Sequence, residues 1–307
     1  MVDTQTQPST GVLSSLSNEL AAAVERAAQS VVTVNGRRRM PASGIIWTAD
    51  GLIVTANHVV ERDEDITVNF GDGDSHAVNL IGRDQGSDIA LLQLDGGSLS
   101  TATRPDTEPR PGHLALAVGR PGQSGPMASL GVISLVGGSW RTSEGTNVES
   151  FIRSDAAMLP GFSGGPLIDT NGAAIGMNSS TVGRRGGLTI PFDAVDSVIT
   201  ALRAHGKVRR GFLGIGAQSV ELNAGLRASL GVEQERALVI VNVQPDGPAE
   251  RGGLMIGDVI LSVQGRQVAT VEELQDHLSG EIVGQPVDVQ LVRGGQLAQA
   301  QVTAGER

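Results

Sequence analysis

Residues 160–167 read Pro-Gly-Phe-Ser-Gly-Gly-Pro-Leu and place one serine, Ser163, among glycines. Glycines let the backbone turn sharply, expose a hydroxyl group and point amide N–H groups at one spot. A serine hydroxyl is a weak nucleophile, so it needs a base to take its proton and donors to stabilise an oxyanion. From this segment alone, a structural turn and a catalytic turn are equally good interpretations.

The residues that follow Ser163 distinguish two enzyme types that use such a serine. The spacing Gly161-x-Ser163-x-Gly165 also fits the nucleophile elbow of α/β-hydrolases, which lies between a strand and a helix. Here residues 166–168 and 173–176 are apolar runs on either side of an Asn-Gly turn, which predicts a hairpin instead. The sequence therefore favours an enzyme whose His and Asp precede the serine.

Both partners are available upstream. His58 follows the apolar run 52–57, at a point where a strand must turn, and Asp88 opens the apolar run 89–94. Asp155 is the rival carboxylate, but it shares the serine loop and leaves little room for an imidazole between the two groups. We favour Asp88.

Composition limits the class of protein. With 42 Gly and 13 Pro in 307 residues, the chain predicts many short strands and a mainly β fold of about two domains. The formal net charge is −10, which makes nucleic acid an unsuitable partner. The absence of Cys excludes disulfides and thiolate chemistry, and we expect neither a metal nor a cofactor.

The pattern along the chain predicts its organisation. Residues 1–12 are polar and predict a disordered tail, and residues 13–206 form the first domain, which opens with a helix over 13–30. Residues 207–211 are a short charged linker, and residues 212–307 have strands enough for a second, small domain.

Two further helices are predicted. The apolar face of residues 193–205 indicates a helix that closes the first domain. In the second domain, Thr270 and Glu273 form a capping box, and Leu274 and Leu278 lie four residues apart on the helix that it begins.

Five stretches together resemble the HtrA (Deg-type) serine proteases. They are SG at 43–44 with GLIVTANHVV at 51–60, SDIALL at 87–92, SDAAMLPGFSGGPL at 154–167, FLGI at 212–215, and GPAERGGLMIGDVI at 247–260. The last two are similar to PDZ domains. Three triad motifs in this order, followed by a PDZ pattern, make a specific combination over about residues 15–303.

The resemblance implies a trypsin-like double six-stranded β-barrel followed by a small α+β PDZ domain. It also implies a serine endopeptidase that cleaves unfolded or damaged proteins in protein quality control, without ATP, and commonly as a homotrimer. The N-terminal segment lacks the aromatic residues that often join such trimers.

The resemblance assigns roles to the candidate residues. Ser163 attacks the carbonyl, His58 takes and returns the proton, and Asp88 orients the imidazole. The N–H groups of Gly161 and Ser163 form the oxyanion hole. We expect Ser163 Oγ and a ring nitrogen of His58 to lie about 2.6–3.2 Å apart, or somewhat further without substrate.

A pocket for the substrate side chain is implied as well. Its base has no acidic residue, which predicts a preference for small or medium apolar side chains. The residues placed there are Ala157, Asn178, Ser179, Ser180, Leu188 and Ile190.

The PDZ-like half is expected to bind a C-terminal peptide as an added strand beside residues 215–217. The residues assigned to this site are Phe212, Leu213, Gly214, Ile215, Leu274 and Leu278. A role of these residues in filling a small core is the alternative interpretation.

The chain departs from the family pattern at two positions. Phe162 precedes the serine where HtrA proteins usually have Asn, and Leu159 replaces another usual Asn. Phe162 excludes activation through a buried ion pair, and it leaves open whether the loop rests active or collapsed. The alternative function is an inert, peptide-binding scaffold or holdase.

The first twenty residues show no signal-peptide pattern. No stretch reaches the roughly 18–20 apolar residues that span a bilayer. The sequence therefore predicts no membrane anchor and a cytoplasmic location, although the family that it resembles is often periplasmic.

Overall fold

The computed structural model of the chain contains two compact units, Met1–Lys207 and Val208–Arg307. The structure describes residues 11–38, 40–96, 98–122, 125–138, 140–141, 147–148, 150–182, 187–278 and 282–306. All but the last two residues of the predicted disordered tail, 1–12, lie outside the described residues.

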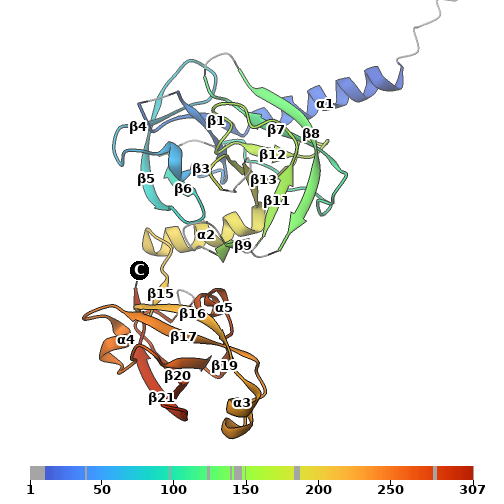
Figure 1. Cartoon of the computed structure of the whole chain (residues 1–307). Helices are drawn as coiled ribbons and strands as arrows, with labels where there is room; N and C mark the ends of the chain where they lie inside the picture. Colours follow the sequence, from blue (N-terminus) through green and yellow to red (C-terminus); the bar gives the residue numbers. More distant parts are fainter. Residues whose placement is uncertain are drawn as a thin grey trace, which may run out of the picture. The chain divides into compact units, whose positions relative to one another are not determined.

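The first six strands close into an antiparallel barrel in the order β1-β2-β3-β6-β5-β4 (Figure 1). They are β1 (Val31–Asn35), β2 (Ala42–Ile46), β3 (Leu52–Ala56), β4 (Ile66–Asn69), β5 (His76–Asp84) and β6 (Ile89–Gln93). Every residue of β2 and β3 is buried. One face of these strands lines the barrel, and β2 and β3 also contact the second barrel, so both faces are buried.

Six later strands close a second antiparallel barrel in the order β11-β14-β13-β12-β7-β8. They are β7 (Leu114–Gly119), β8 (Met127–Gly137), β11 (Phe151–Ser154), β12 (Pro166–Ile168), β13 (Ala174–Ser179) and β14 (Leu188–Pro191). A separate pair, β9 (Trp140–Arg141) and β10 (Asn147–Val148), lies between β8 and β11 in the sequence. The hairpin predicted after Ser163 is β12 and β13.

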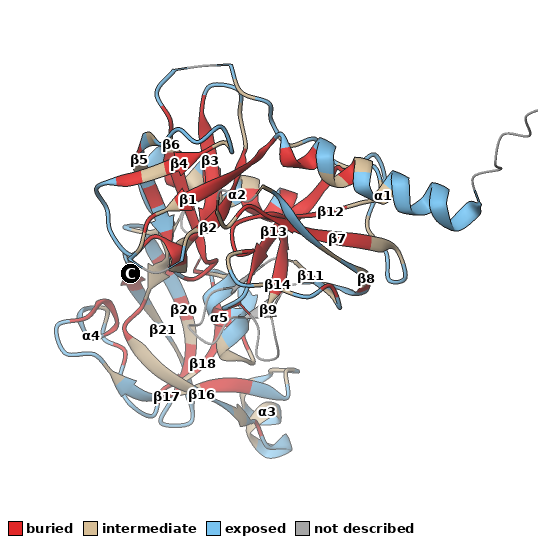
Figure 2. Ribbon diagram, turned by 90° about the horizontal axis from the view of Figure 1, so that it is seen from above, coloured by how far each residue is buried: buried red, intermediate tan, exposed pale blue. Residues whose placement is uncertain are grey.

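Two helices flank the barrels. Helix α1 (Val12–Ala28) packs its alanines Ala23 and Ala27 against Leu116 and Ile168 of the second barrel. Its N-terminal half is exposed and extends away from the barrels (Figure 2). Helix α2 (Phe192–His205) contacts β5 and β6 of the first barrel and β13 and β14 of the second. Its C-cap is Gly206, whose φ of +70° suits a glycine.

Aromatic and ionic contacts fasten α2 to the first barrel. The rings of Trp47 and Phe192 stack with their centroids 3.9 Å apart, and Trp47 Nε1–H donates to Asp196 Oδ1 at 2.8 Å. The Arg104 guanidinium carbon lies 4.5 Å from the centroid of the Phe192 ring, and the group pairs with Asp193 and Asp196. The helix that leads out of the first unit is thus anchored at its first turn.

The second unit is built on a sheet in the order β16-β17-β18-β20-β21. The elements are β15 (Gly211–Phe212), β16 (Ile215–Glu221), α3 (Ala224–Leu230), β17 (Arg236–Val243), α4 (Pro248–Arg251), β18 (Val259–Val263), β19 (Arg266–Gln267), α5 (Val271–Asp276), β20 (Pro286–Arg293), β21 (Gln296–Thr303) and β22 (Gly305–Glu306). Strand β15 pairs with β22, and β19 pairs with β18. Because β16 ends the sheet, one of its edges is free of a strand partner among the described residues.

The capping box at the start of α5 is confirmed, since Thr270 accepts from the Glu273 N–H and the Glu273 side chain reaches back to the Thr270 N–H. The predicted extent of this helix was too long. Helix α5 ends at Asp276, and Leu278 lies beyond its cap, His277. Leu278 is nevertheless buried, because the turn after the helix folds it into the core.

A buried carboxylate stabilises the second unit. Asp258 is 2% exposed and accepts from the Nε–H and Nη2–H of Arg293 at 2.8 and 2.6 Å and from the Met255 N–H at 2.9 Å. Burial alone raises the pKa of Asp258, but the hydrogen bonds and the charge of Arg293 outweigh it, so the pKa lies below its ordinary value. The same contact raises the pKa of Arg293.

In the residues that the structure describes, no helix combines the length and the apolar character that crossing a bilayer requires.

Candidate active site

His58 and Asp88 meet at one end of the first barrel. His58 lies in a short 3-10 turn, Asn57–Val59, that follows β3, and Asp88 immediately precedes β6, the neighbour of β3. His58 Nδ1 lies 2.8 Å from Asp88 Oδ2 and 3.0 Å from Oδ1. Asp88 is 3% exposed, whereas the imidazole is partly accessible. The pairing of β3 with β6 brings the two residues together.

The main chain reinforces this pair. Asp88 Oδ1 also accepts from the His58 N–H at 2.9 Å, and the Asp88 carbonyl accepts from the Asn57 N–H at 2.9 Å. Asp88 has a φ of +57°, a left-handed conformation that Asp adopts more readily than most residues. The turn that carries His58 is therefore held by both the backbone and the side chain of Asp88.

Two hydroxyl groups from the second barrel complete the surroundings of this carboxylate. Ser179 Oγ donates to Asp88 Oδ2 at 2.5 Å, and Thr181 Oγ1 donates to the same oxygen at 2.9 Å. Thr181 Oγ1 also lies 3.2 Å from His58 Nδ1. The Asp88 carboxylate thus has donors from both barrels, which fixes its orientation and that of the imidazole.

The loop around Ser163 depends on its glycines. Gly161 and Gly164 each have a φ of +85°. A Cβ on Gly164 would lie 2.1 Å from the Ser43 carbonyl oxygen, and one on Gly161 would lie 2.3 Å from Cβ of Pro121. Substituted residues would therefore be both strained and displaced here.

Hydrogen bonds from both barrels hold the loop. Ser43, in β2, donates its N–H to the Ser163 carbonyl at 3.1 Å and its hydroxyl to the Gly161 carbonyl at 2.7 Å. From β13, Asn178 accepts from the Gly164 N–H and donates its own N–H to the Gly165 carbonyl, both at 2.8 Å. The loop is thus fixed on each side of Ser163.

Arg120 extends this network. Its N–H donates to Ser43 Oγ at 2.8 Å, and its guanidinium donates to the carbonyls of Val31 and Ala28. Burial lowers the pKa of Arg120, while the charge of Asp72 partly opposes that shift. Arg120 therefore links the end of α1 and β1 to the serine that holds the loop.

Two amides of the loop remain available to a ligand. In the described part of the chain, the N–H groups of Gly161 and Ser163 donate to no backbone or side-chain acceptor. The neighbouring Phe162 N–H, in contrast, donates to the Leu159 carbonyl at 3.1 Å. Unpaired N–H groups on either side of Phe162 suit an anionic oxygen.

The hydrogen bonds of the Ser163 hydroxyl in the described residues go to Ser180 and not to His58. The hydroxyl donates to Ser180 Oγ at 2.9 Å and accepts from the Ser180 N–H at 3.3 Å. Ser180 Oγ lies 3.5 Å from His58 Nε2. Within the ranges that the structure covers, no hydrogen bond joins Ser163 to His58, so the direct contact expected from the sequence is replaced by one through Ser180.

Phe162 is wholly buried. Its side chain is 0% exposed and packs in the core of the second barrel with Ile133, Ile152 and Leu167. An apolar ring thus occupies the interior beneath the loop and anchors it through the hydrophobic effect. The departure from the family pattern at this position is accommodated by the core.

The rival carboxylate, Asp155, has a different role. Its Oδ1 accepts from the Val132 N–H at 2.6 Å, and its own N–H donates to the Val132 carbonyl. These bonds join β11 to β8 at a register shift. Asp155 therefore supports the second barrel, and Asp88 is the carboxylate beside His58.

The residues expected around a specificity pocket differ in their contacts. Ala157 is exposed, while Leu188 and Ile190 are buried. Asn178 is also buried, and its Oδ1 accepts from Thr189 Oγ1 at 2.8 Å. The side chains of Ser179 and Ser180 instead reach Asp88 and Ser163, as described above. The hydroxyl groups of Ser179 and Ser180 therefore bond to residues of the proposed triad.

Sequence reasoning missed Ser43 and Thr181. Ser43 lay within a quoted motif but carried no predicted role, and Thr181 follows directly on the Asn-Ser-Ser run of residues 178–180. A cluster of hydroxyl residues at the end of an otherwise apolar strand was the available signal, because buried hydroxyls need partners.

In the second unit, residues 213–214 form a short loop between β15 and β16. Gly214 has a φ of +79°, and its carbonyl accepts from the Gln244 N–H at 2.8 Å. Leu213 is buried, and its carbonyl accepts from the Ala249 N–H at 2.7 Å. Among the described residues, the N–H groups of Leu213 and Gly214 have no backbone acceptor. This loop can therefore donate to a carboxylate.

The expected groove residues also contribute to the core. Leu274 and Leu278 lie in the buried cluster of the second unit, and Ile215 and Ala217 of β16 pack against that cluster. The two leucines therefore fill the core, and their role in a groove beside β16 stays a prediction.

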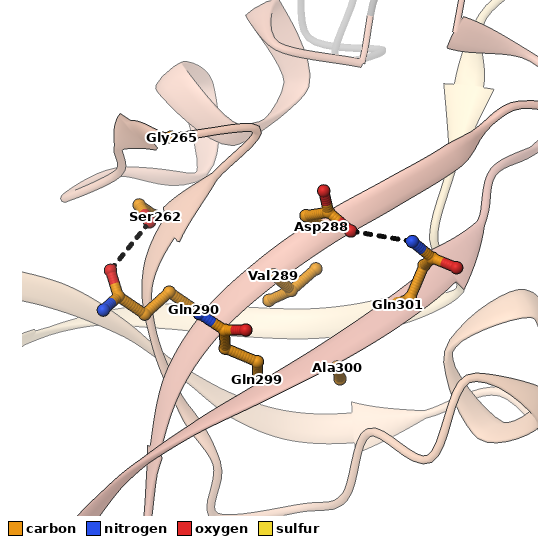
Figure 3. A pocket seen from close by; sticks show the side chains of 8 residues that line it. All are labelled: Ser262, Gly265, Asp288, Val289, Gln290, Gln299, Ala300 and Gln301. Carbon is orange, nitrogen blue, oxygen red and sulfur yellow. Dashed lines mark hydrogen bonds between the residues drawn. The ribbon is translucent and has the colours of Figure 1, made fainter.

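A hollow in the second unit has a volume of about 510 Å³ (Figure 3). It is lined by Ser262, Gly265, Asp288, Val289, Gln290, Gln299, Ala300 and Gln301. Ser262 bonds to Gln290, and Asp288 bonds to Gln301, so these polar groups satisfy one another. The hollow lies on β18, β20 and β21, away from the β16 edge.

Comparisons with known proteins agree with this geometry. Residues 42–177 match the family pattern of the trypsin-like peptidase domain, and residues 211–304 match that of the PDZ domain. The chain is 36% identical over 270 residues to the probable periplasmic serine endoprotease DegP-like of Pseudomonas putida (strain W619). The match covers 86% of this chain and 55% of that relative, so the chain spans about half the length of the curated relatives it matches.

Solved structures match over nearly the whole chain. The serine endoprotease from Yersinia pestis superposes with a TM-score of 0.78 at 30% identity, covering 94% of this chain and 98% of that one. The HtrA-type protease AlgW with a decapeptide superposes with a TM-score of 0.76 at 30% identity and the same coverage. Two six-stranded antiparallel barrels followed by a PDZ domain, as the sequence predicted, are thereby confirmed.

Proposed function

Because the chain belongs to the HtrA family of serine proteases, with a trypsin-like domain and one PDZ domain, we propose that it hydrolyses peptide bonds with Ser163, His58 and Asp88 as its catalytic triad. The observation that carries this proposal is the 2.8 Å contact between His58 Nδ1 and the buried Asp88 carboxylate. An imidazole paired with a carboxylate, near a serine that is flanked by glycines, is the arrangement that activates a serine hydroxyl as a nucleophile.

The contacts of His58 define its part in the reaction. Asp88 accepts a hydrogen bond from Nδ1–H, so the lone pair of Nε2 is the one that can take a proton from Ser163. Ser163 Oγ then attacks the peptide carbonyl, and the imidazolium, paired with Asp88, returns the proton to the leaving amine. Water repeats the sequence on the acyl-enzyme and releases the product.

The N–H groups of Gly161 and Ser163 are proposed to receive the oxyanion. Each such donor typically contributes about 2.7–4 kcal/mol to stabilisation of the transition state. The lack of acceptors for these N–H groups among the described residues, and the anchoring of Phe162, support an oxyanion-binding segment that is already formed before substrate binds. Activation by cleavage of the chain is not expected.

The substrates that we propose are unfolded or damaged proteins. Burial of Leu188 and Ile190, and the absence of an acidic residue at Ala157, support cleavage after small or medium apolar side chains. A C-terminal peptide is proposed to add beside β16, with its carboxylate at the N–H groups of Leu213 and Gly214. Peptide binding there would regulate cleavage.

Assembly and location are further parts of the proposal. A homotrimer is the assembly expected from the family, and size-exclusion chromatography with light scattering measures it. The cytoplasmic location that the sequence predicts stays a prediction, because the curated relatives are named as periplasmic. Cell fractionation distinguishes the two compartments.

Active-site labelling tests the proposed activity. A fluorophosphonate probe should modify Ser163, and the variants Ser163→Ala and His58→Ala should lose that modification, with casein digestion lost in parallel. Absence of labelling in the unaltered chain, with and without C-terminal peptides, would support the inert scaffold instead. The exposed Ser229→Ala variant, in helix α3 of the second unit, is a matched control that should label normally.

A further inference from the structure

Ser180 takes up both hydrogen-bonding functions of the Ser163 hydroxyl. Ser163 Oγ has one proton, which it donates to Ser180 Oγ at 2.9 Å, and it accepts the Ser180 N–H at 3.3 Å. We propose that Ser180 is a positioning residue that holds the Ser163 hydroxyl away from His58 until a substrate is bound. This inference rests on the proposed role of Ser163 as the nucleophile.

The distances favour a holding role over a relay of the proton. Ser180 Oγ lies 3.5 Å from His58 Nε2, which is longer than a normal hydrogen bond between a hydroxyl and a ring nitrogen. The contact between Ser163 and Ser180 is short, and the contact between Ser180 and His58 is weak. The proton of Ser163 is thus directed to a group that is not a base.

The backbone register builds this contact. Asn178 is fixed to Gly164 and Gly165 by two hydrogen bonds of 2.8 Å, and Ser179 is held to Asp88 through its hydroxyl. Ser180 follows directly, so its N–H and side chain are placed against Ser163 by their neighbours. The arrangement therefore does not depend on a freely rotating side chain of Ser180 alone.

Exposure makes the hold reversible. Ser180 is exposed, whereas Ser163 is 7% exposed. A bound peptide can therefore reach Ser180 and alter its contacts without disturbing a core. Release of the hold requires only that Ser163 rotate about its side-chain bond, after which Oγ can donate to His58 Nε2.

The test compares Ser180→Ala with Ser180→Thr. The alanine removes the acceptor for the Ser163 proton, and the threonine keeps a hydroxyl at that position. We expect the rate constant for fluorophosphonate labelling of Ser163 to rise roughly three- to tenfold in Ser180→Ala, as the loss of one hydrogen bond predicts. Peptide hydrolysis should show a lower KM with little change in kcat, because the hold is already released in the substrate complex, and Ser180→Thr should stay near the unaltered enzyme.

A fall in the labelling rate of Ser180→Ala would overturn the proposal, since it would show that Ser180 assists the reaction. An unchanged rate would overturn it as well. Crystal structures of the unaltered chain and Ser180→Ala give a readout independent of activity: Ser163 Oγ should move to within about 3.2 Å of His58 Nε2 in the variant. If it does not move, the hold does not exist. If Ser163→Ala is labelled as fast as the unaltered chain, Ser163 is not the nucleophile. The two crystal structures would still show whether Ser180 holds the Ser163 hydroxyl.

Discussion

The ring of Phe162 lies so close to Gly119 of β7 that a Cβ on Gly119 would come within 2.7 Å of the ring carbon Cδ1. The same Cβ would lie 2.9 Å from Ser43 Oγ, which donates to the Gly161 carbonyl. Because Gly119 has no side chain, there is room both for the Phe162 ring and for the Ser43 hydroxyl, and both of these hold the serine loop.

Gly119→Ala should therefore slow fluorophosphonate labelling of Ser163, by roughly tenfold or more, because Phe162 and Ser43 must both shift and overpacking commonly costs about 1–3 kcal/mol. The thermal midpoint of the first unit should fall as well. Gly122→Ala is the matched control, since a Cβ there would meet nothing within 4 Å, and its labelling rate and thermal midpoint should stay unchanged. Normal labelling of Gly119→Ala would show that the loop does not depend on this packing.

Thr181→Val should lower kcat for peptide hydrolysis several-fold, with little change in KM. The substitution keeps the shape of the side chain but removes the hydroxyl that bonds to Asp88 Oδ2 and lies near His58 Nδ1. A single neutral hydrogen bond of this kind is worth about 0.5–1.5 kcal/mol, more where its partner is charged. Thr181→Ser should restore the rate, and equal rates in the two variants would contradict the proposed contact.

Asp258→Asn should destabilise the second unit at neutral pH and progressively less in acid. The pKa of Asp258 is lowered in the folded chain, so its stabilisation is complete above the ordinary value of 3.8 and is lost as the pH falls through that value toward the folded pKa. We expect a loss of about 1–2 kcal/mol, discounted because Arg293 is partly exposed to solvent.

Hydrogen exchange of the β17 and β18 amides, followed by mass spectrometry in the full chain, measures this difference. Comparing Asp258→Asn with the unaltered chain at each pH cancels the intrinsic exchange chemistry. The difference in amide exchange rate between Asp258→Asn and the unaltered chain should become smaller between about pH 5 and pH 3. A difference that stays constant over this range would show that the charge of Asp258 contributes nothing.

Gly214→Ala should weaken binding of a C-terminal peptide roughly fivefold or more, measured by fluorescence polarisation. Gly214 has a φ of +79°, and its added Cβ would lie 3.3 Å from Cδ of Pro248, so the loop must change its backbone to accept the side chain. Gly253→Ala is a matched control, because φ there is +75° with open space around it. Equal effects of both substitutions would indicate general destabilisation.

The sequence predicted His58, Asp88 and the hairpin after Ser163, because each of these depends on local pattern: a histidine at the end of one apolar strand, an aspartate at the start of another, and an Asn-Gly turn. The capping box of Thr270 was predicted for the same reason. Phe162 was harder to interpret, since the space that receives its ring depends on Gly119, far away in the sequence.

Long-range register explains what the sequence did not reveal. The directions of the Ser179 and Ser180 side chains follow from the pairing of Asn178 with Gly164 and Gly165, which no local pattern encodes. Leu278 has the spacing of a helical residue, but the helix ends two residues earlier. The predicted linker at residues 207–211 stays a prediction, and limited proteolysis tests it.

Neither barrel owns a complete set of reactive groups. His58 and Asp88 come from one barrel. Ser163 and Ser179, whose hydroxyl donates a hydrogen bond to Asp88, come from the other. A shift of one barrel relative to the other by roughly an ångström or two would break the hydrogen bond between Ser179 and Asp88. Every strand would stay paired within its own barrel. On heating, proteolytic activity should therefore be lost when the two barrels separate from each other. This loss should occur at temperatures where the circular dichroism signal of the strands is still unchanged.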